Sequence, residues 1–219
     1  MTCASPFPYF GGKRTIVDLV WSRFGHVRQY LEPFCGSAAM LMGAPRIARQ
    51  ETIGDQNLFV ANFWRAVKYQ PARVAEASDH PVVHIDMTAR HRWLIEPHRT
   101  AALRQHLMDP EWPGDARIAG WWVWGQSAWI GSGWCTGDRA VDQVPRSACR
   151  GAGVHRPSHG PDLVTLADMF AALATRLRRC VVINGDWTRC LNSHYGRSYG
   201  HTADGRGQME LHLGVPQAK

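Results

Sequence analysis

The stretch Tyr30–Ala39 constrains the fold of this chain more than any other. A short apolar run leads through Glu32 and Pro33 into a turn built from Gly36 and Ser37, and small helix-forming residues follow. A strand, a glycine turn and a helix in this order are typical of the first unit of a doubly wound nucleotide-binding sheet. Because a residue before proline is held out of the helical region, Pro33 keeps Glu32 extended. The sequence therefore predicts an α/β fold with a cofactor crevice at the end of this strand.

Two flanking segments support this prediction. Upstream, Gly11-Gly12-Lys13 opens a stretch with apolar residues at helix-face spacing. Paired glycines and a cation at a helix start form a pocket for a carboxylate or phosphate. Downstream, Asp55 follows the short run Glu51-Thr52-Ile53 and lies about 20 residues past the glycine turn, where an acidic side chain binds ribose hydroxyls.

These segments together resemble a known family. Tyr9-Phe10-Gly11-Gly12-Lys13, Glu32-Pro33-Phe34-Cys35-Gly36-Ser37 and Asp55-Gln56-Asn57 are similar to the ordered N-terminal motifs of the Dam-type (D12 class) DNA adenine-N6 methyltransferases. The resemblance implies a Rossmann-like S-adenosylmethionine-dependent methyltransferase sheet. It implies that S-adenosyl-L-methionine is bound by the matching residues, which are Tyr9, Gly12, Lys13, Glu32, Phe34, Gly36 and Asp55. Ala38 departs from the pattern, since many members have glycine there, and we expect its methyl group to narrow the turn.

Regular structure is predicted again after residue 160. The start signal Pro161-Asp162 precedes leucines at helix-face spacing, and Cys180–Asn184 has the pattern of a buried strand. Family members carry a helix, a strand and a Gly-Asp-aromatic turn here, so the resemblance places Asp186 near the adenine of the cofactor. We expect residues 1–75 and 160–219 to form the cofactor-binding domain, incomplete at its C-terminal end.

Residues 76–159 are then an inserted, mainly helical and loop region for target recognition. Its helical pattern from residue 86 to 108 is broken at Pro97. The Trp- and Gly-rich run of residues 119–134 supplies Trp129 and Trp134 as candidates to stack on DNA bases. The alternative is that most of these indoles form the core of the insertion. On the loop that follows, the candidates for phosphate contacts are Arg139, Arg146, Arg150 and Arg156, although a merely solvated loop would have the same composition.

Composition narrows the class of partner and the compartment. A net charge of +7 and a pI near 9.4 suit a polyanion, and the family resemblance implies double-stranded DNA. No apolar stretch approaches the roughly 18 residues needed to span a bilayer, and no N-terminal segment has the pattern of a secretory signal. We therefore expect a soluble, cytoplasmic protein with no membrane partner. Nothing in these patterns indicates an oligomeric state.

The six cysteines show no Cys-x-x-Cys pair, so reduced thiols are expected. One zinc alternative rests on spacing alone and uses Cys135, Cys149, His155 and His159, the two histidines being four residues apart. Without a close cysteine pair, ordinary polar loop residues are the favoured interpretation, and no metal site is assigned.

The catalytic motif of the family, Asp-Pro-Pro-Tyr or a close variant, does not occur in the 219 residues. Its polar groups hydrogen-bond the adenine amine while its aromatic ring stacks on the flipped base. The segment Asp109-Pro110-Glu111-Trp112 resembles it superficially, but it follows a helical pattern and has Glu111 in place of the second proline. No catalytic residue is therefore assigned.

The sequence favours a site-specific DNA adenine-N6 methyltransferase family member that uses S-adenosylmethionine and does not methylate DNA by itself. One alternative is a non-catalytic DNA-binding remnant, or a subunit that needs a partner chain to complete the site. A nicotinamide-dependent oxidoreductase fits only the generic glycine turn and does not explain Gly11-Gly12-Lys13.

Overall fold

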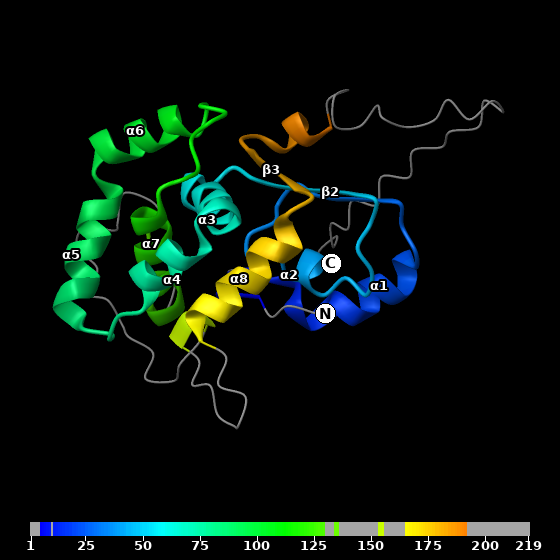
Figure 1. Cartoon of the computed structure of the whole chain (residues 1–219), viewed down its shortest axis with the longest axis horizontal. Coiled ribbons are helices and arrows are strands. Elements are labelled where there is room, and N and C mark those ends of the chain that lie inside the picture. Colours follow the sequence, from blue (N-terminus) through cyan, green and yellow to red (C-terminus); the bar gives the residue numbers. More distant parts are fainter. Residues whose placement is uncertain (1–4, 10, 130–133, 136–152, 156–164, 192–219) are drawn as a thin grey trace, which may run out of the picture.

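The computed structural model describes residues 5–9, 11–129, 134–135, 153–155 and 165–191. Three strands in this part of the chain, β1 (Gln29–Glu32), β2 (Gln50–Asp55) and β3 (Cys180–Asn184), form a parallel sheet in the order β1-β2-β3 (Figure 1). Because all three are parallel, their carboxyl ends meet at one edge of the sheet. The predicted α/β class and all three predicted strands are confirmed, and the Rossmann-like detail stays a prediction.

Three short helical elements flank β1 in the chain. The 3-10 turn η1 (Lys13–Ile16) leads into α1 (Val17–Phe24), and α2 (Ala39–Met42) follows the glycine turn. The buried Trp21 of α1 lies against the Tyr30 ring of β1, with 5.1 Å between ring centroids, and its indole N–H donates to the Met40 carbonyl at 2.9 Å. One side chain thus ties α1 to both β1 and α2.

The helix α3 (Leu58–Tyr69) follows directly after the Asp55-Gln56-Asn57 motif. Asn57 caps it, since its side-chain oxygen accepts from the Phe59 N–H at 2.9 Å. Phe63 and Trp64 of its apolar face are fully buried, so this face belongs to the core. Pro71 then opens α4 (Pro71–Ser78), because proline is tolerated at the first position of a helix.

The remaining helices form a group away from the strands (Figure 1). They are α5 (His84–Ile95), α6 (Pro97–His106), α7 (Ala116–Ala128) and the short turn η3 (Gly153–His155), and the break predicted at Pro97 separates α5 from α6. The ring of Trp122 on α7 lies 5.0 Å from Phe7 and 6.0 Å from Phe63. The hydrophobic core is therefore continuous across residue 75, where the sequence predicts a domain boundary, and the division into domains stays a prediction. No helix in the described ranges has the length and apolar character needed to span a membrane.

Most of the tryptophans of residues 119–134 that the structure describes pack as core residues. Trp122, Trp124 and Trp134 are buried. Gly125 is required where it stands, because a Cβ atom there would overlap the ring of Trp134. The interpretation of this run as a packed core is confirmed for these three indoles.

The helix α8 (Leu166–Leu177) precedes β3, and η4 (Trp187–Cys190) follows it. Thr165 caps α8 in a reciprocal capping box with Asp168. The start signal proposed at Pro161-Asp162 lies outside the described residues.

A buried ion pair joins α8 to β2. The Arg176 guanidinium donates to both carboxylate oxygens of Glu51, at 2.8 Å for Nη2 to Oε1, and to the Leu41 carbonyl at 3.0 Å. The two side chains are only 7% and 3% exposed. Sequence analysis did not identify this pair, since it joins residues 125 positions apart.

We expect Arg176→Met to lower the free energy of unfolding by about 3–5 kcal/mol, because it leaves the Glu51 carboxylate buried without its cation. Arg179→Met on the exposed end of the same segment is the matched control and should change stability by less than about 0.5 kcal/mol. Chemical denaturation followed by circular dichroism measures both values. Equal stability of the two variants would contradict a structural role for the pair.

Candidate functional site

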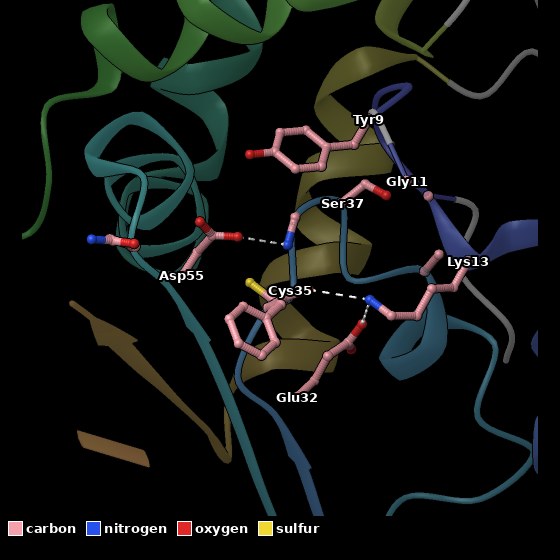
Figure 2. Close-up of a pocket in the computed structure, with 12 residues that line it drawn as sticks. Tyr9, Gly11, Lys13, Glu32, Cys35, Ser37 and Asp55 are labelled. Atoms are coloured by element: carbon pink, nitrogen blue, oxygen red, sulfur yellow. Dashed lines mark hydrogen bonds and ion pairs between the residues drawn. The ribbon is translucent and has the colours of Figure 1, made fainter. Parts of the chain in front are cut away.

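A cavity of about 310 Å³ lies at the carboxyl ends of β1 and β2 (Figure 2). Its lining includes seven of the eight residues predicted to bind the cofactor, and they come from three separate segments: Tyr9, Gly12, Lys13, Glu32, Phe34, Gly36 and Asp55. Its volume is within the range of small-molecule sites, roughly 300–1,000 Å³. The structure thus brings together residues that are up to 46 positions apart, from Tyr9 to Asp55.

Asp55, at the end of β2, holds the glycine turn in place. Its Oδ2 accepts from the Gly36 N–H at 2.9 Å, and its Oδ1 accepts from the Asn57 N–H at 2.9 Å. Burial raises the pKa of Asp55, although these hydrogen bonds favour the charged form. Each carboxylate oxygen can accept more than one hydrogen bond, so the group keeps capacity for hydroxyl donors of a ligand.

The turn itself needs glycine for two reasons. Gly36 has a positive φ of 47°, and a Cβ atom at this position would overlap the ring of Tyr9. Ala38 also adopts the left-handed region, with φ 48° and ψ 36°, and is fully buried. Ala38 is not among the residues that line the cavity. In this structure alanine in place of the family's glycine therefore strains the backbone and does not narrow the cavity.

On the other side of the turn, Glu32 is a buried acid with three polar neighbours. Its Oε2 accepts from the Tyr30 hydroxyl at 2.9 Å and from the Leu41 N–H at 3.3 Å. The Lys13 Nζ lies 3.9 Å from its Oε1 and donates to the Phe34 carbonyl at 3.2 Å. Burial raises the pKa of Glu32 to about 7, and Lys13 opposes that rise. Burial next to Glu32 raises the pKa of Tyr30 as well.

The charges around the glycine turn restrict the ligand. One cation, Lys13, and two carboxylates, Glu32 and Asp55, line the cavity. A pyrophosphate placed against this turn would face the buried acid Glu32, whose charged form, present as the pH rises through about 7, would repel it. A ligand with a carboxylate, a positive charge and hydroxyl donors would meet a partner for each group.

Residues outside the predicted set also line the cavity. They are Gly11, Cys35, Ser37, Ala39 and Gln56, each within three positions of a predicted residue. Burial raises the pKa of the Cys35 thiol well above its usual value, with Asp55 and Glu32 adding to the effect. Cys35 therefore stays protonated and serves as packing. These positions could have been predicted from their place on the same tight turns as the predicted residues. The chemistry of their side chains gives no such signal.

Asp186, the eighth predicted residue, is not among the residues that line the cavity. Its Oδ1 accepts from the Thr188 N–H at 2.9 Å and the Thr188 hydroxyl at 2.6 Å, and these bonds lower its pKa. It caps η4 from the exposed side of the turn that follows β3. The tip of β3 is nevertheless fastened beside the site, because the Gly185 N–H and the Asn184 side chain both donate to the Asp55 carbonyl.

The two tryptophans predicted to contact DNA lie in a cluster with His91. Trp129 is half-buried and stacks on the His91 ring at 5.3 Å. Trp134 is 4% exposed and donates its indole N–H to the Trp122 carbonyl at 2.9 Å, so protein already covers nearly all of its ring. The four arginines predicted for phosphate contacts, Arg139, Arg146, Arg150 and Arg156, lie outside the described residues.

For the zinc alternative, Cys149 and His159 likewise lie outside the described residues. Cys135 is buried beside His91, with 3.3 Å from its N–H to the His91 Nδ1, and the His155 Nε2 lies 3.1 Å from the Trp124 carbonyl. Among the residues that the structure describes, no three side chains of metal-binding type form a cluster.

The segment Asp109–Trp112 follows α6 as a turn, as the sequence predicts. The Asp109 Oδ1 accepts from the Glu111 N–H at 2.9 Å. Trp112 stacks on the His106 ring at 5.3 Å. Neither side chain lines the cavity at the glycine turn, so this segment contributes nothing to that site.

The raised pKa of Glu32 makes stability depend on pH. Burial favours the protonated carboxyl group of Glu32 in the folded state. Its contribution to the free energy of unfolding is therefore fully present below the unfolded pKa of 4.5 and is lost as the pH rises through the folded pKa of about 7. We expect the unfolding free energy of the wild type, relative to Glu32→Gln, to fall by about 2 kcal/mol between pH 5 and pH 8. Urea denaturation of both proteins at the two pH values tests this. A difference that does not change with pH would show that the carboxyl group titrates normally.

Comparison with known proteins adds one finding. No curated protein matches the sequence. A family model does match, over a segment that runs from Tyr9 through the glycine turn and Asp55 to the first residue of α5. The matched segment contains all seven predicted residues that line the cavity. The resemblance found in the motifs is confirmed, because residues 9–84 of this chain match the D12 class N6 adenine-specific DNA methyltransferase family.

Proposed function

We propose that this chain binds S-adenosyl-L-methionine in the cavity at the glycine turn. The observation that carries the proposal is the convergence of Lys13, Glu32 and Asp55 on one turn at the edge of a parallel sheet. The family match over the same residues supports a methyltransferase, for which this cofactor is the usual methyl donor. NAD is disfavoured by the acid Glu32 beside the glycine turn, where its pyrophosphate would lie.

The residues of the cavity suit different parts of this cofactor. Lys13 provides a cation for the methionine carboxylate, and Asp55 provides acceptors for the ribose hydroxyls. Gly36 lets the ring of Tyr9, which also lines the cavity, pack against the turn, since a side chain at this position would overlap that ring. When bound, the cofactor supplies an electrophilic methyl group on a sulfonium centre. The protein's own contribution at this site is to bind and orient that group.

Isothermal titration calorimetry with S-adenosylmethionine and with NAD tests the assignment. We expect S-adenosylmethionine to bind more tightly, and Asp55→Ala to weaken its binding by about 1–3 kcal/mol, because the ribose and the Gly36 N–H both lose an acceptor. Asp18→Ala, an exposed acid on α1, is the matched control and should bind like the wild type. Tighter binding of NAD, or unchanged affinity in a folded Asp55→Ala variant, would argue against the site.

We also propose duplex DNA as the macromolecular partner, on the basis of the family match and the net charge of +7. Trp129 and the predicted arginines of residues 139–156 are the candidates that sequence analysis supplies for this contact. Trp134 would have to leave its position against Trp122 to stack on a base.

A second proposal is that the chain alone does not transfer a methyl group to DNA. The exocyclic amine of adenine is a poor nucleophile, so the rate depends on a polar clamp that orients it in the transition state. No Asp-Pro-Pro-Tyr motif or close variant is present in the 219 residues to provide that clamp. In this proposal the 219 residues bind the cofactor and DNA, and methyl transfer needs a polar clamp that these residues do not contain.

The measurement for this proposal is transfer of a labelled methyl group from the cofactor to mixed-sequence duplex DNA by the purified 219-residue protein. We expect no incorporation above a control without protein, even at concentrations that saturate the cofactor site. The Asp55→Ala variant serves as the matched blank. Incorporation by the wild type that the variant loses would show that the chain is an active enzyme.

A further inference from the structure

Three helices far from the cavity share a stack of arginine and tryptophan side chains, which we call the arginine–tryptophan ladder. Its members, in spatial order, are Arg99 of α6, Trp93 of α5, Arg117 and Trp121 of α7, Arg90 of α5 and Trp124 of α7. Each guanidinium carbon lies between 3.9 and 5.6 Å from the centre of an adjacent indole ring. Trp93 and Trp121 also contact each other edge to face at 5.1 Å.

The arginines of the ladder keep hydrogen-bonding capacity. Within the described residues, Arg117 is exposed and forms no hydrogen bond or ion pair, and the buried Nη1 of Arg90 has no hydrogen-bond partner. Only Arg99 pairs with an acid, Glu96, at 2.9 Å. A guanidinium that stacks by its face leaves its edge N–H groups available and held in one orientation, which suits bidentate binding of a phosphate.

An open hollow of about 590 Å³ adjoins the ladder at Arg117 and Trp121. Arg73 and His80 line it from the side of α4, and Trp112 lines it from the loop before α7. Two acids, Glu76 and Asp115, also line it. Asp115 is already engaged as the cap of α7, where its Oδ1 accepts from the Ile118 N–H at 2.8 Å. The hollow thus combines guanidinium groups with indole faces, and its volume is within the range of small-ligand sites.

We propose that the ladder and its hollow bind the backbone of DNA, with phosphates on Arg117 and Arg73. Guanidinium forks match phosphate oxygens, so the surface is suited to the backbone contacts of a nucleic acid. Glu76 lines the hollow and Glu96 pairs with Arg99, and both acids would repel a phosphate placed next to them. We therefore expect phosphates to contact only the N–H groups at the edges of the arginines. This inference rests on the proposed function only in taking DNA as the partner, and it uses none of the residues of the cavity.

Fluorescence anisotropy with labelled single-stranded and duplex oligonucleotides, at several salt concentrations, tests the surface. We expect Arg117→Gln to weaken binding on the order of 10-fold and to reduce the slope of log affinity against log salt by about 0.7–0.9. Trp121→Leu should weaken binding about 5-fold, because the Arg117 guanidinium loses an indole ring that orients it. Arg104→Gln, an exposed arginine of α6 outside the ladder, is the matched control and should bind like the wild type.

Arg73→Gln provides a second test away from the stacked rings, and a thermal unfolding curve of each variant shows whether it is folded. Loss of affinity in folded Arg117→Gln and Arg73→Gln, with Arg104→Gln unchanged, would support the surface. Absence of DNA binding by the wild type at low salt, or equal affinities of all four proteins, would overturn it. Calorimetry with S-adenosylmethionine on the same variants separates the two proposals, because the ladder variants should keep the affinity of the wild type for the cofactor.

Discussion

The carboxylate of Asp55 is the interaction on which the site depends. It accepts from the Gly36 N–H with one oxygen and from the Asn57 N–H with the other. Asn57 in turn caps α3, the helix that carries much of the hydrophobic core. One side chain therefore fastens the glycine turn after β1 to the start of α3, and any ligand at the turn is bound against a rigid element. Precise positioning of this kind is what a cofactor site requires.

Charge in the interior is organised around the same strands. Glu51 and Arg176 neutralise each other between β2 and α8, at a point that no ligand reaches. Glu32 is different, because its cation, Lys13, lies 3.9 Å away and is itself 41% exposed. A weak internal partner leaves Glu32 with a pKa near neutrality, and it leaves Lys13 free to interact with a ligand carboxylate. The difference between the two pairs distinguishes a structural ion pair from charges that a ligand can use.

The helices α4 to α7 show two uses of tryptophan in one region. Trp122, Trp124 and Trp134 fill the core, and Gly125 provides the space for one of these rings. Trp93 and Trp121 pack against this core, remain partly exposed and have arginine guanidinium groups over their rings. Arginine over an indole stabilises the contact between helices while it keeps a charge at the surface. The region is therefore both a part of the core and a candidate contact surface for a polyanion.

Local sequence determined much of this protein. The strand before Pro33, the glycine turn, the cap at Asn57 and the helix break at Pro97 follow from backbone preferences that act within a few residues. The family resemblance of three short motifs also identified seven of the residues that line the cavity. Short βα units bring the ends of adjacent parallel strands together, which is why these motifs meet. Tertiary structure decided the rest. The partner of Arg176, the burial of Trp134 and the position of Asp186 outside the cavity depend on packing between segments far apart in the chain, and no local preference encodes such contacts.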